Sequence, residues 1–243
     1  MIEKIHKDLK DNLKKYNQDL LDMKAQEILI WGHEKFGNQF AITTSFGIQS
    51  SVLLNMLSQS GLQKKIKIFW IDTGYLPQET YHYAQKLIND LSLEIEVLQS
   101  ELSPARMEAL YGKLWETNKA EDLDKYHELR KIKPLENALE KYNIQCWASG
   151  IRSSQTEDRN KMNLLDLIRQ RLSLRPLLNW TNKDIFYYME ENNLPAHPLF
   201  SKGYSTVGDW HSSSQDGIDI KGRSTRFGGI KQECGIHIND YQI

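Results

Sequence analysis

One cysteine near the carboxyl end of the chain has the surroundings of a nucleophile. Cys234 lies in the segment 231–237, with Lys231 and His237 three residues to either side. The thiolate is the reactive form of cysteine, and nearby positive charge lowers the pKa of a thiol. Gly235 leaves room for a substrate to approach the sulfur. The segment therefore makes Cys234 a candidate nucleophile, although a cysteine near the end of a chain is by itself more often an exposed thiol without a function.

The other cysteine predicts a structural role. Cys146 lies in an apolar run beside Trp147 and Ala148, where a free cysteine behaves as a small hydrophobic residue. Two cysteines also cannot supply a four-cysteine iron–sulfur cluster or zinc site. We therefore expect no iron–sulfur cluster, no metal and no bound cofactor.

Three further segments combine glycine with groups that bind anions or nucleotides. Residues 45–51 place a glycine and several hydroxyls between a predicted strand and a predicted helix, where backbone amides can approach an anion. Asp72 could accept a hydrogen bond from a ribose or a purine amine, although aspartate is also a common turn residue. In the third segment Gly150 allows close approach, and the guanidinium of Arg152 can bind a phosphate or sulfate.

These segments follow predicted strands in a chain that alternates between strand and helix patterns. Strands are predicted at 40–43, 66–71, 93–98 and 144–148, with helices at 77–91 and 134–142. Such alternation predicts an α/β fold with a mostly parallel, doubly wound, Rossmann-like sheet and helices on both faces. Ligands of such sheets bind at the carboxyl ends of the strands, so the three segments should meet at one edge.

The pattern changes towards both ends of the chain. Residues 1–36 predict a helical segment, and residues 37–208 predict the α/β domain. Within that domain, residues 172–178 could form a further strand, and Thr181 begins a capping-box pattern for a helix through Glu191. Residues 209–243 are polar with little apolar periodicity, and we expect a flexible tail that carries the catalytic cysteine.

The overall charge gives no sign of a polyanionic partner. The chain has 31 basic and 32 acidic residues, for a formal net charge of −1. This balance argues against nucleic acid and membrane surfaces as partners, so an anion site must be built locally. Residues 1–16 are charged and contain no apolar core of a signal peptide, and no long apolar run follows. We expect a cytoplasmic protein.

Several motifs together resemble the phosphoadenylyl-sulfate (PAPS) reductases of the PP-loop family. Residues 44–50 resemble the modified PP-loop of that family. The ATP pyrophosphatases carry the sequence serine-glycine-glycine-x-aspartate-serine in this loop. This chain has Phe46 in place of the second-position glycine and Gln49 in place of the aspartate. That departure favours a sulfonucleotide over ATP. Further similar segments occur in family order at 72–76, 79–81, 111–115, 149–152, 208–211 and 233–237, of which Glu-Cys-Gly-Ile-His at 233–237 is the most specific.

The resemblance implies a fold, a site and a reaction. The fold would be that of the adenine nucleotide alpha hydrolases. The cysteine would attack the sulfur of PAPS to form an S-sulfocysteine, which thioredoxin or glutaredoxin would resolve to sulfite. The protein would be a homodimer of sulfate assimilation, and the tail would close over the nucleotide. The implied substrate-binding residues are Ser45, Phe46, Gly47, Gln49, Ser50, Asp72, Thr73, Gly74, Gly150, Ile151, Arg152, Arg159, His211, Arg226, Lys231 and His237, with Cys234 catalytic.

Two departures from the family leave alternatives open. Ser153 and Gln232 stand where many relatives carry arginine, so the preference for a 3′-phosphate rests on other basic residues, such as Arg159 and Arg226. One alternative is an adenylyl-sulfate (APS) reductase without a cluster. Another is an ATP-using PP-loop enzyme, which would normally keep an acidic metal ligand in place of Gln49. A non-catalytic nucleotide-binding module would have no need of the motif around Cys234.

Overall fold

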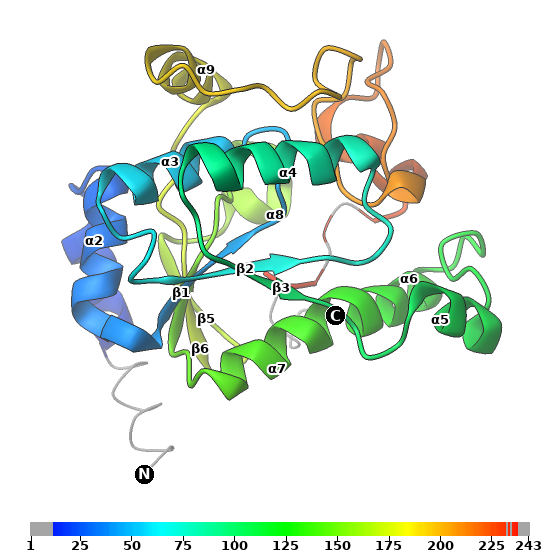
Figure 1. Ribbon diagram of the computed structural model, residues 1–243, viewed down its shortest axis with the longest axis horizontal. Helices are drawn as coiled ribbons and strands as arrows, with labels where there is room; N and C mark the ends of the chain where they lie inside the picture. The colour runs from blue at the N-terminus through cyan, green and yellow to red at the C-terminus, as the bar shows by residue number, and fades with distance from the viewer. Residues whose placement is uncertain (1–11, 232, 234, 238–243) are drawn as a thin grey trace.

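A computed structural model describes residues 12–231, 233 and 235–237 of the protein. The centre of the fold is a six-stranded sheet with the order β3-β2-β1-β4-β6-β5 (Figure 1). All neighbouring strands are parallel except β5 and β6, which are antiparallel. The strands are β1 (Phe40–Thr44), β2 (Lys67–Ile71), β3 (Ile95–Leu98), β4 (Cys146–Ala148), β5 (Leu165–Ile168) and β6 (Arg171–Leu174).

Helices cover both faces of this sheet. In Figure 1, α3 and α4 lie on one side of the strands and α7 lies on the other. The longer helices are α2 (Ala25–Phe36), α3 (Ser51–Gln59), α4 (Gln78–Asp90), α5 (Pro104–Tyr111), α6 (Ala120–His127), α7 (Lys133–Lys141) and α9 (Asn182–Glu191). The short ones are η1 (Gly37–Gln39), η2 (Glu128–Ile132, a π-helical turn), η3 (Ser153–Gln155), α8 (Glu157–Asn160), η4 (Trp210–Ser212) and η5 (Gly222–Gly229).

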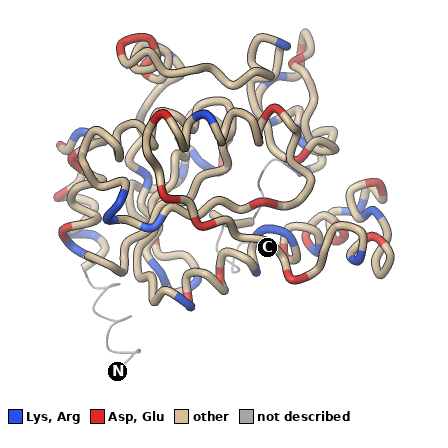
Figure 2. Tube along the Cα trace, viewed as in Figure 1, with Lys and Arg blue, Asp and Glu red and all other residues tan. Residues whose placement is uncertain are grey.

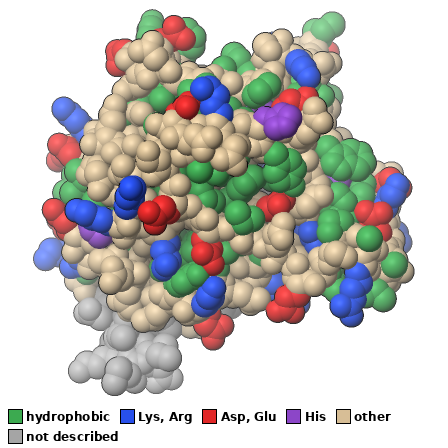
Figure 3. All heavy atoms as spheres, viewed as in Figure 1, with side chains coloured by type: hydrophobic (Ala, Val, Ile, Leu, Met, Phe, Trp, Pro, Cys, Tyr) green, Lys and Arg blue, Asp and Glu red, His purple; other side chains and the backbone are tan. Residues whose placement is uncertain are grey.

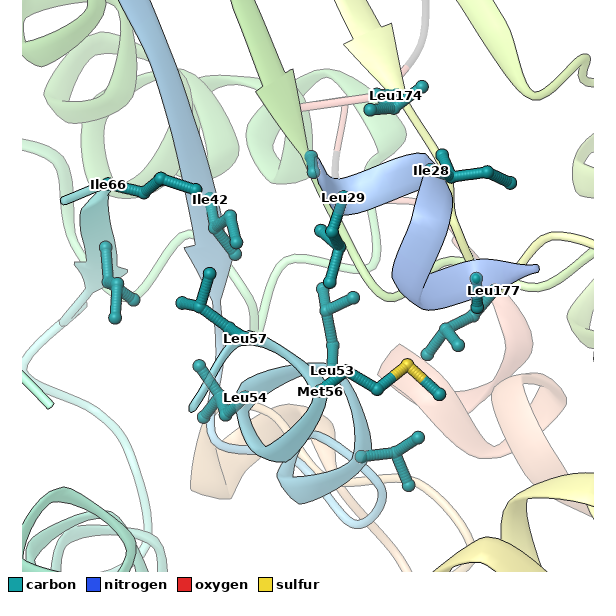
Figure 4. Packing of buried hydrophobic residues seen from close by; sticks show 14 of the residues in the cluster. Ile28, Leu29, Ile42, Leu53, Leu54, Met56, Leu57, Ile66, Leu174 and Leu177 are labelled. Carbon is teal, nitrogen blue, oxygen red and sulfur yellow. The ribbon is translucent and has the colours of Figure 1, made fainter. Parts of the chain in front are cut away.

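Two apolar clusters hold these layers together. On one face, side chains of α2, α3 and β1 point towards one another, including Leu29, Leu53, Leu57 and Ile42 (Figure 4). On the other face, α7 packs on β1, β2 and β4 through a separate cluster that contains Trp147. β1 is buried along its whole length, as expected for a central parallel strand that is covered on both sides.

Most of the predicted elements are confirmed, including the strands that precede the three segments predicted to bind a ligand. The capping box of α9 is also confirmed, because the Thr181 hydroxyl accepts from the Asp184 amide and the Asp184 carboxylate accepts from the Thr181 amide at 2.7 Å. The edge strand β5 was not predicted. Its hairpin to β6 turns at Arg169 and Gln170, both with positive φ, and neither residue type signals such a turn.

The described residues beyond 208 return to the sheet. They form short turns rather than long helices or strands, in agreement with the absence of apolar periodicity. Asp209, Ser212, Thr225 and Arg226 are nevertheless buried. The predicted flexibility of this segment stays a prediction, while its packing against the domain is part of the structure.

The surface is mixed in charge. Lys and Arg are interspersed with Asp and Glu along the described trace (Figure 2). Hydrophobic side chains gather on the right of the face in Figure 3, around α5, α6 and η4, where Leu110, Tyr111 and Trp210 are exposed. None of the helices in the described ranges is long and apolar enough to cross a bilayer.

Candidate active site

A pocket of about 250 Å³ lies at the carboxyl ends of β1 and β4. The chain runs from β1 outwards to β2 and β3 and then returns to place β4 on the other side of β1, so the pocket sits at the topological switch point. Eleven of the predicted substrate-binding residues line it, namely Ser45, Gly47, Gln49, Ser50, Thr73, Gly150, Ile151, Arg152, Arg159, Arg226 and His237.

Five predicted substrate-binding residues do not line the pocket: Phe46, Asp72, Gly74, His211 and Lys231. Cys234, the predicted nucleophile, lies outside the described residues. The sequence on both sides of it is described, and Ile236 and His237 contribute to the pocket lining. The placement of each of the five has a local physical reason.

Phe46 belongs to the core rather than to the pocket. Its φ is +46°, a conformation that favours glycine, and this turn directs the side chain inwards. The ring is fully buried and packs edge-to-face on Trp70, with the ring centroids 4.9 Å apart. The neighbouring Ser45 is exposed. The loop therefore presents Ser45 and Gly47 to the pocket and anchors itself through Phe46.

Asp72 and Gly74 shape the turn after β2. The Asp72 carboxylate accepts hydrogen bonds from the Gly74 amide at 2.8 Å, the Tyr81 hydroxyl at 2.7 Å and the Gln99 amide at 2.8 Å. Its oxygens are thus engaged by protein donors. Gly74 has a φ of +74°, and a Cβ there would come within 2.7 Å of Pro104. Thr73, between them, is the residue that reaches the pocket.

Gln49 and Arg152 meet in the pocket. A guanidinium nitrogen of Arg152 donates to the Gln49 side-chain oxygen, and another donates to Asn182 Oδ1 at 2.8 Å. Burial, with the charge of Arg159 adding to it, lowers the pKa of Arg152 to about 10, so the group is charged at neutral pH. Gln49, which stands where the resemblance places an acidic metal ligand in ATP-using enzymes, therefore orients the Arg152 guanidinium.

Lys131 is a pocket residue that the sequence analysis missed. It lies in the π-helical turn η2, lines the pocket, and pairs with the buried Asp209 at 2.6 Å. Thr73 Oγ1 donates to the other Asp209 oxygen at 2.5 Å. Burial alone would raise the pKa of Asp209, but the charges of Lys131 and Arg226 and these hydrogen bonds lower it. A local π-helical turn, which often marks functional sites, has no signature in a single sequence.

Arg226 packs against the backbone of Gly208. A Cβ at Gly208 would lie 2.2 Å from two guanidinium nitrogens of Arg226, so only glycine leaves space for this arrangement. Arg226 also donates to Ser212 Oγ at 2.7 Å and to Ser213 Oγ at 3.2 Å. These contacts join η5 to the segment around η4 and bring the cation to the pocket.

Arg159 binds a carboxylate of the C-terminal segment. Its Nε and Nη2 each donate to Glu233 at 2.8 Å, and Thr156 Oγ1 donates to the same carboxylate at 2.9 Å. Burial alone would raise the pKa of Glu233, but the charges of Arg159 and Arg223 lower it overall. Glu233, which was not predicted as a site residue, is therefore an ionised buried group beside the predicted nucleophile in the sequence.

The positive charge predicted at Lys231 and His237 is arranged differently in the structure. Lys231 pairs with Asp124 on α6. Burial and the nearby arginine charges lower the pKa of His237 well below its usual value, so this imidazole is neutral at neutral pH. Arginines therefore carry the positive charge next to the 233–237 segment.

Two further sequence interpretations can be compared with the geometry. His211 lies in an aromatic cluster, stacked on Trp115 at 4.0 Å with its Nε2 3.1 Å from the Tyr126 hydroxyl. Cys146 is fully buried, as predicted, and burial raises the pKa of its thiol. In the described part of the chain, no three His, Cys, Asp or Glu side chains form a metal-binding group.

The lining as a whole is suited to a polyanion of small-molecule size. Five cationic side chains reach it: Lys131, Arg152, Arg159, Arg223 and Arg226. Asp209 is the only carboxylate among the described lining residues, and it is already paired. The Ser149 hydroxyl, also in the lining, is buried without a hydrogen-bond partner among the described residues. Cations, hydroxyls and the start of a helix at a switch point define an α/β protein with a pocket suited to an anionic nucleotide.

Comparisons with known proteins make this class specific. The phosphoadenosine phosphosulfate reductase domain matches residues 39–215. The chain is 47% identical to a phosphoadenosine 5′-phosphosulfate reductase of Synechococcus, over 93% of this chain and 97% of the relative. It is 43% identical to the protein of the same name from Synechocystis, over 90% and 88%. The chain belongs to the phosphoadenosine phosphosulfate reductase family, as the motifs indicated.

Solved structures agree with the fold. A crystal structure of phosphoadenylyl-sulfate reductase from Candida auris, a phosphate complex, is 26% identical, covers 84% of this chain and 97% of that one, and superimposes with a TM-score of 0.72. An FMN adenylyltransferase from Candida glabrata is 16% identical, covers 81% of this chain and 63% of that one, and has a TM-score of 0.57. The second likeness concerns the fold alone, and it confirms the predicted sheet type.

Proposed function

We propose that this protein reduces 3′-phosphoadenylyl sulfate to sulfite and adenosine 3′,5′-bisphosphate, with Cys234 as the nucleophile. The observation that supports this most is the proximity of two features. Five cations converge on a switch-point pocket, and Ile236 and His237, close to Cys234 in the sequence, contribute to the same lining. An anionic substrate in the pocket would therefore lie next to the segment that carries the thiol.

The cationic side chains receive the phosphates and the sulfate. Arg152, Arg226 and Lys131 are the best placed, because each lines the pocket and is held by a neighbouring side chain. Fixed donors stabilise charge that develops on a leaving phosphate without any need to reorganise. The hydroxyls of Ser45, Ser50 and Ser149 complete the set of groups that meet the anion.

The reaction takes place in two displacements. The Cys234 thiolate attacks sulfur, the bond between sulfur and the phosphate oxygen breaks, and adenosine 3′,5′-bisphosphate leaves with the electron pair. The product is S-sulfocysteine. A thiolate of an external dithiol then attacks the Cys234 sulfur, and sulfite leaves with the electron pair of the S–S bond. The second thiol of the donor resolves the mixed disulfide and restores Cys234.

The electron donor is an external protein dithiol, thioredoxin or glutaredoxin. The sequence contains only one other cysteine, and Cys146 is fully buried in β4, so it is not placed to resolve the intermediate. The C-terminal segment covers the nucleotide during the first displacement and opens for the donor in the second. We also propose a cytoplasmic homodimer that works without a resident cofactor or cluster.

Mass spectrometry of the reduced protein mixed with PAPS, in the absence of any donor, tests this function. We expect the Cys234 peptide to gain one sulfonate. Cys234→Ser should abolish both the adduct and sulfite release, whereas Cys146→Ala should retain turnover. A wild-type protein that never gains the adduct would exclude the proposed chemistry.

Turnover assays with a dithiol donor, and a pyrophosphate assay with ATP, separate the alternatives that the sequence left open. Faster turnover of APS than of PAPS would assign the protein to cluster-free APS reduction. Pyrophosphate release from ATP would assign it to the ATP-using enzymes. The preference for PAPS is supported by the arginines at 223 and 226 in the lining, which offset the absence of arginine at 153 and 232.

A further inference from the structure

The residues on both sides of Cys234 in the sequence are held by the α/β domain. On the amino side, Glu233 is 6% exposed and Arg159 is 5% exposed. Two parallel hydrogen bonds of 2.8 Å join the Arg159 guanidinium to the two carboxylate oxygens. Thr156, at the start of α8, donates a third. This bidentate geometry is among the most directional that a side-chain pair can form.

On the carboxyl side, the backbone is held by a second arginine. Arg169, in the β5–β6 turn, donates to the Gly235 carbonyl at 3.1 Å and to the Ile236 carbonyl at 2.8 Å. Glu136 on α7 orients this guanidinium through a 2.8 Å ion pair. The Ile236 side chain is 7% exposed and belongs to the apolar cluster beneath α7.

Gly235 permits this docking. It has a φ of +77°, and a Cβ at this position would come within 2.9 Å of Ile132. The backbone therefore passes closer to η2 than any other residue would allow. Polar contacts, an apolar side chain and a close backbone approach together determine where the segment lies.

We propose that Arg159 with Glu233, and Arg169 with the 235–236 carbonyls, form a two-sided clamp that positions the Cys234 thiol for attack. This inference rests on the proposed function, because it assigns a task to groups around the proposed nucleophile. The clamp residues are positioning residues, since they act through the chain and not on the reacting atoms.

The hydrogen bonds of Arg159 also distinguish its positioning role from the substrate-binding role of the other pocket cations. Three of its nitrogens donate to protein acceptors, two to Glu233 and one to Gln155. Its directional hydrogen bonds thus serve the C-terminal segment, while Arg152, Arg226 and Lys131 serve the anion. Loss of the clamp should slow the attack on sulfur and leave nucleotide affinity nearly unchanged. Displacement of a reacting group by about 1 Å can cost about 100-fold in rate.

The test compares single-turnover sulfonation of Cys234 with the affinity for adenosine 3′,5′-bisphosphate, in the full-length protein. Glu233→Gln and Arg169→Lys each remove one side of the clamp. We expect each to slow sulfonation about 10- to 100-fold, with a dissociation constant within about threefold of wild type. Glu96→Gln is the matched control, because Glu96 forms an exposed pair with Lys141 away from the pocket, and its rate should match wild type.

Arg159→Gln and the double variant Arg159→Gln/Glu233→Gln complete a double-mutant cycle. If the pair acts as a unit, the double variant should be no slower than the slower single variant. Thermal unfolding and nucleotide binding of each variant show that it is folded, and Arg169→Lys tests the clamp without leaving the Arg159 charge buried alone.

Three results would overturn the inference: unchanged sulfonation in both Glu233→Gln and Arg169→Lys, a loss of affinity that matches the loss of rate, or tighter nucleotide binding in Glu233→Gln. The last would mean that Glu233 competes with substrate for Arg159. A wild-type protein that forms no sulfonate would instead reject the proposed function itself, so the two failures are distinguishable.

Discussion

One wall of the pocket comes from the ends of β1 and β4 and the loops that follow them, at residues 43–45, 47–50 and 149–152, whereas the other comes from residues 205–209, Arg223, Arg226 and Lys131. The strand-end wall consists of short loops in which the Arg152 guanidinium donates to the neutral side chains of Gln49 and Asn182. The C-terminal wall depends on buried charge pairs and close backbone contacts between segments far apart in the sequence. Substitutions in the second wall should therefore affect stability, while those in the first should mainly affect ligand binding.

The largest effect is expected at Asp209. Asp209→Asn removes the charge that pairs with Lys131, and both groups are almost fully buried. Because an unpaired buried cation remains, the free energy of unfolding should fall by about 3–5 kcal/mol, measured by urea denaturation. Asp90→Asn, in an exposed pair with Lys86, should change it by no more than about 1 kcal/mol. Equal effects of the two substitutions would show that the buried Lys131–Asp209 pair contributes no more to stability than an exposed pair.

A smaller loss is expected at Gly208. Gly208→Ala would place a methyl group on the Arg226 guanidinium, and such overpacking costs about 1–3 kcal/mol. Because Arg226 must move, the affinity for adenosine 3′,5′-bisphosphate should fall as well, as measured by calorimetry. Gly217→Ala is the control, since the nearest atom to its Cβ would be 3.7 Å away. Retention of wild-type stability and affinity in Gly208→Ala would show that the Arg226 guanidinium is not held against Gly208.

The smallest effect is expected in the strand-end wall. Gln49→Asp places a carboxylate beside the Arg152 guanidinium and neutralises a pocket cation. Affinity for adenosine 3′,5′-bisphosphate should fall about tenfold, or about 1.4 kcal/mol, with little change in thermal stability. Gln49→Glu should act in the same direction. Unchanged affinity in both variants would mean that Arg152 does not meet the anion.

The same contrast explains which parts of the site could be predicted from the sequence. Ser45, Gly47 and Arg152 were suggested by glycine and polar residues that follow buried strands, whereas Gln49 was implied by the resemblance to the PAPS reductases. Lys131 was missed because a lone lysine in a polar segment looks like a solvated surface residue, and Glu233 was named only as part of the motif around Cys234. Asp72 was recognised as either a ligand or a turn residue, and only its three protein donors show that its oxygens are engaged.

The sequence by itself determined the strand and helix alternation, the strand-end loops and the family, since each depends on residues that are close together or on a motif. Tertiary structure alone decided which charges are paired, for example Arg159 with Glu233 across 74 residues. Burial and pairing depend on neighbours that only the folded chain brings together, and no local pattern encodes them.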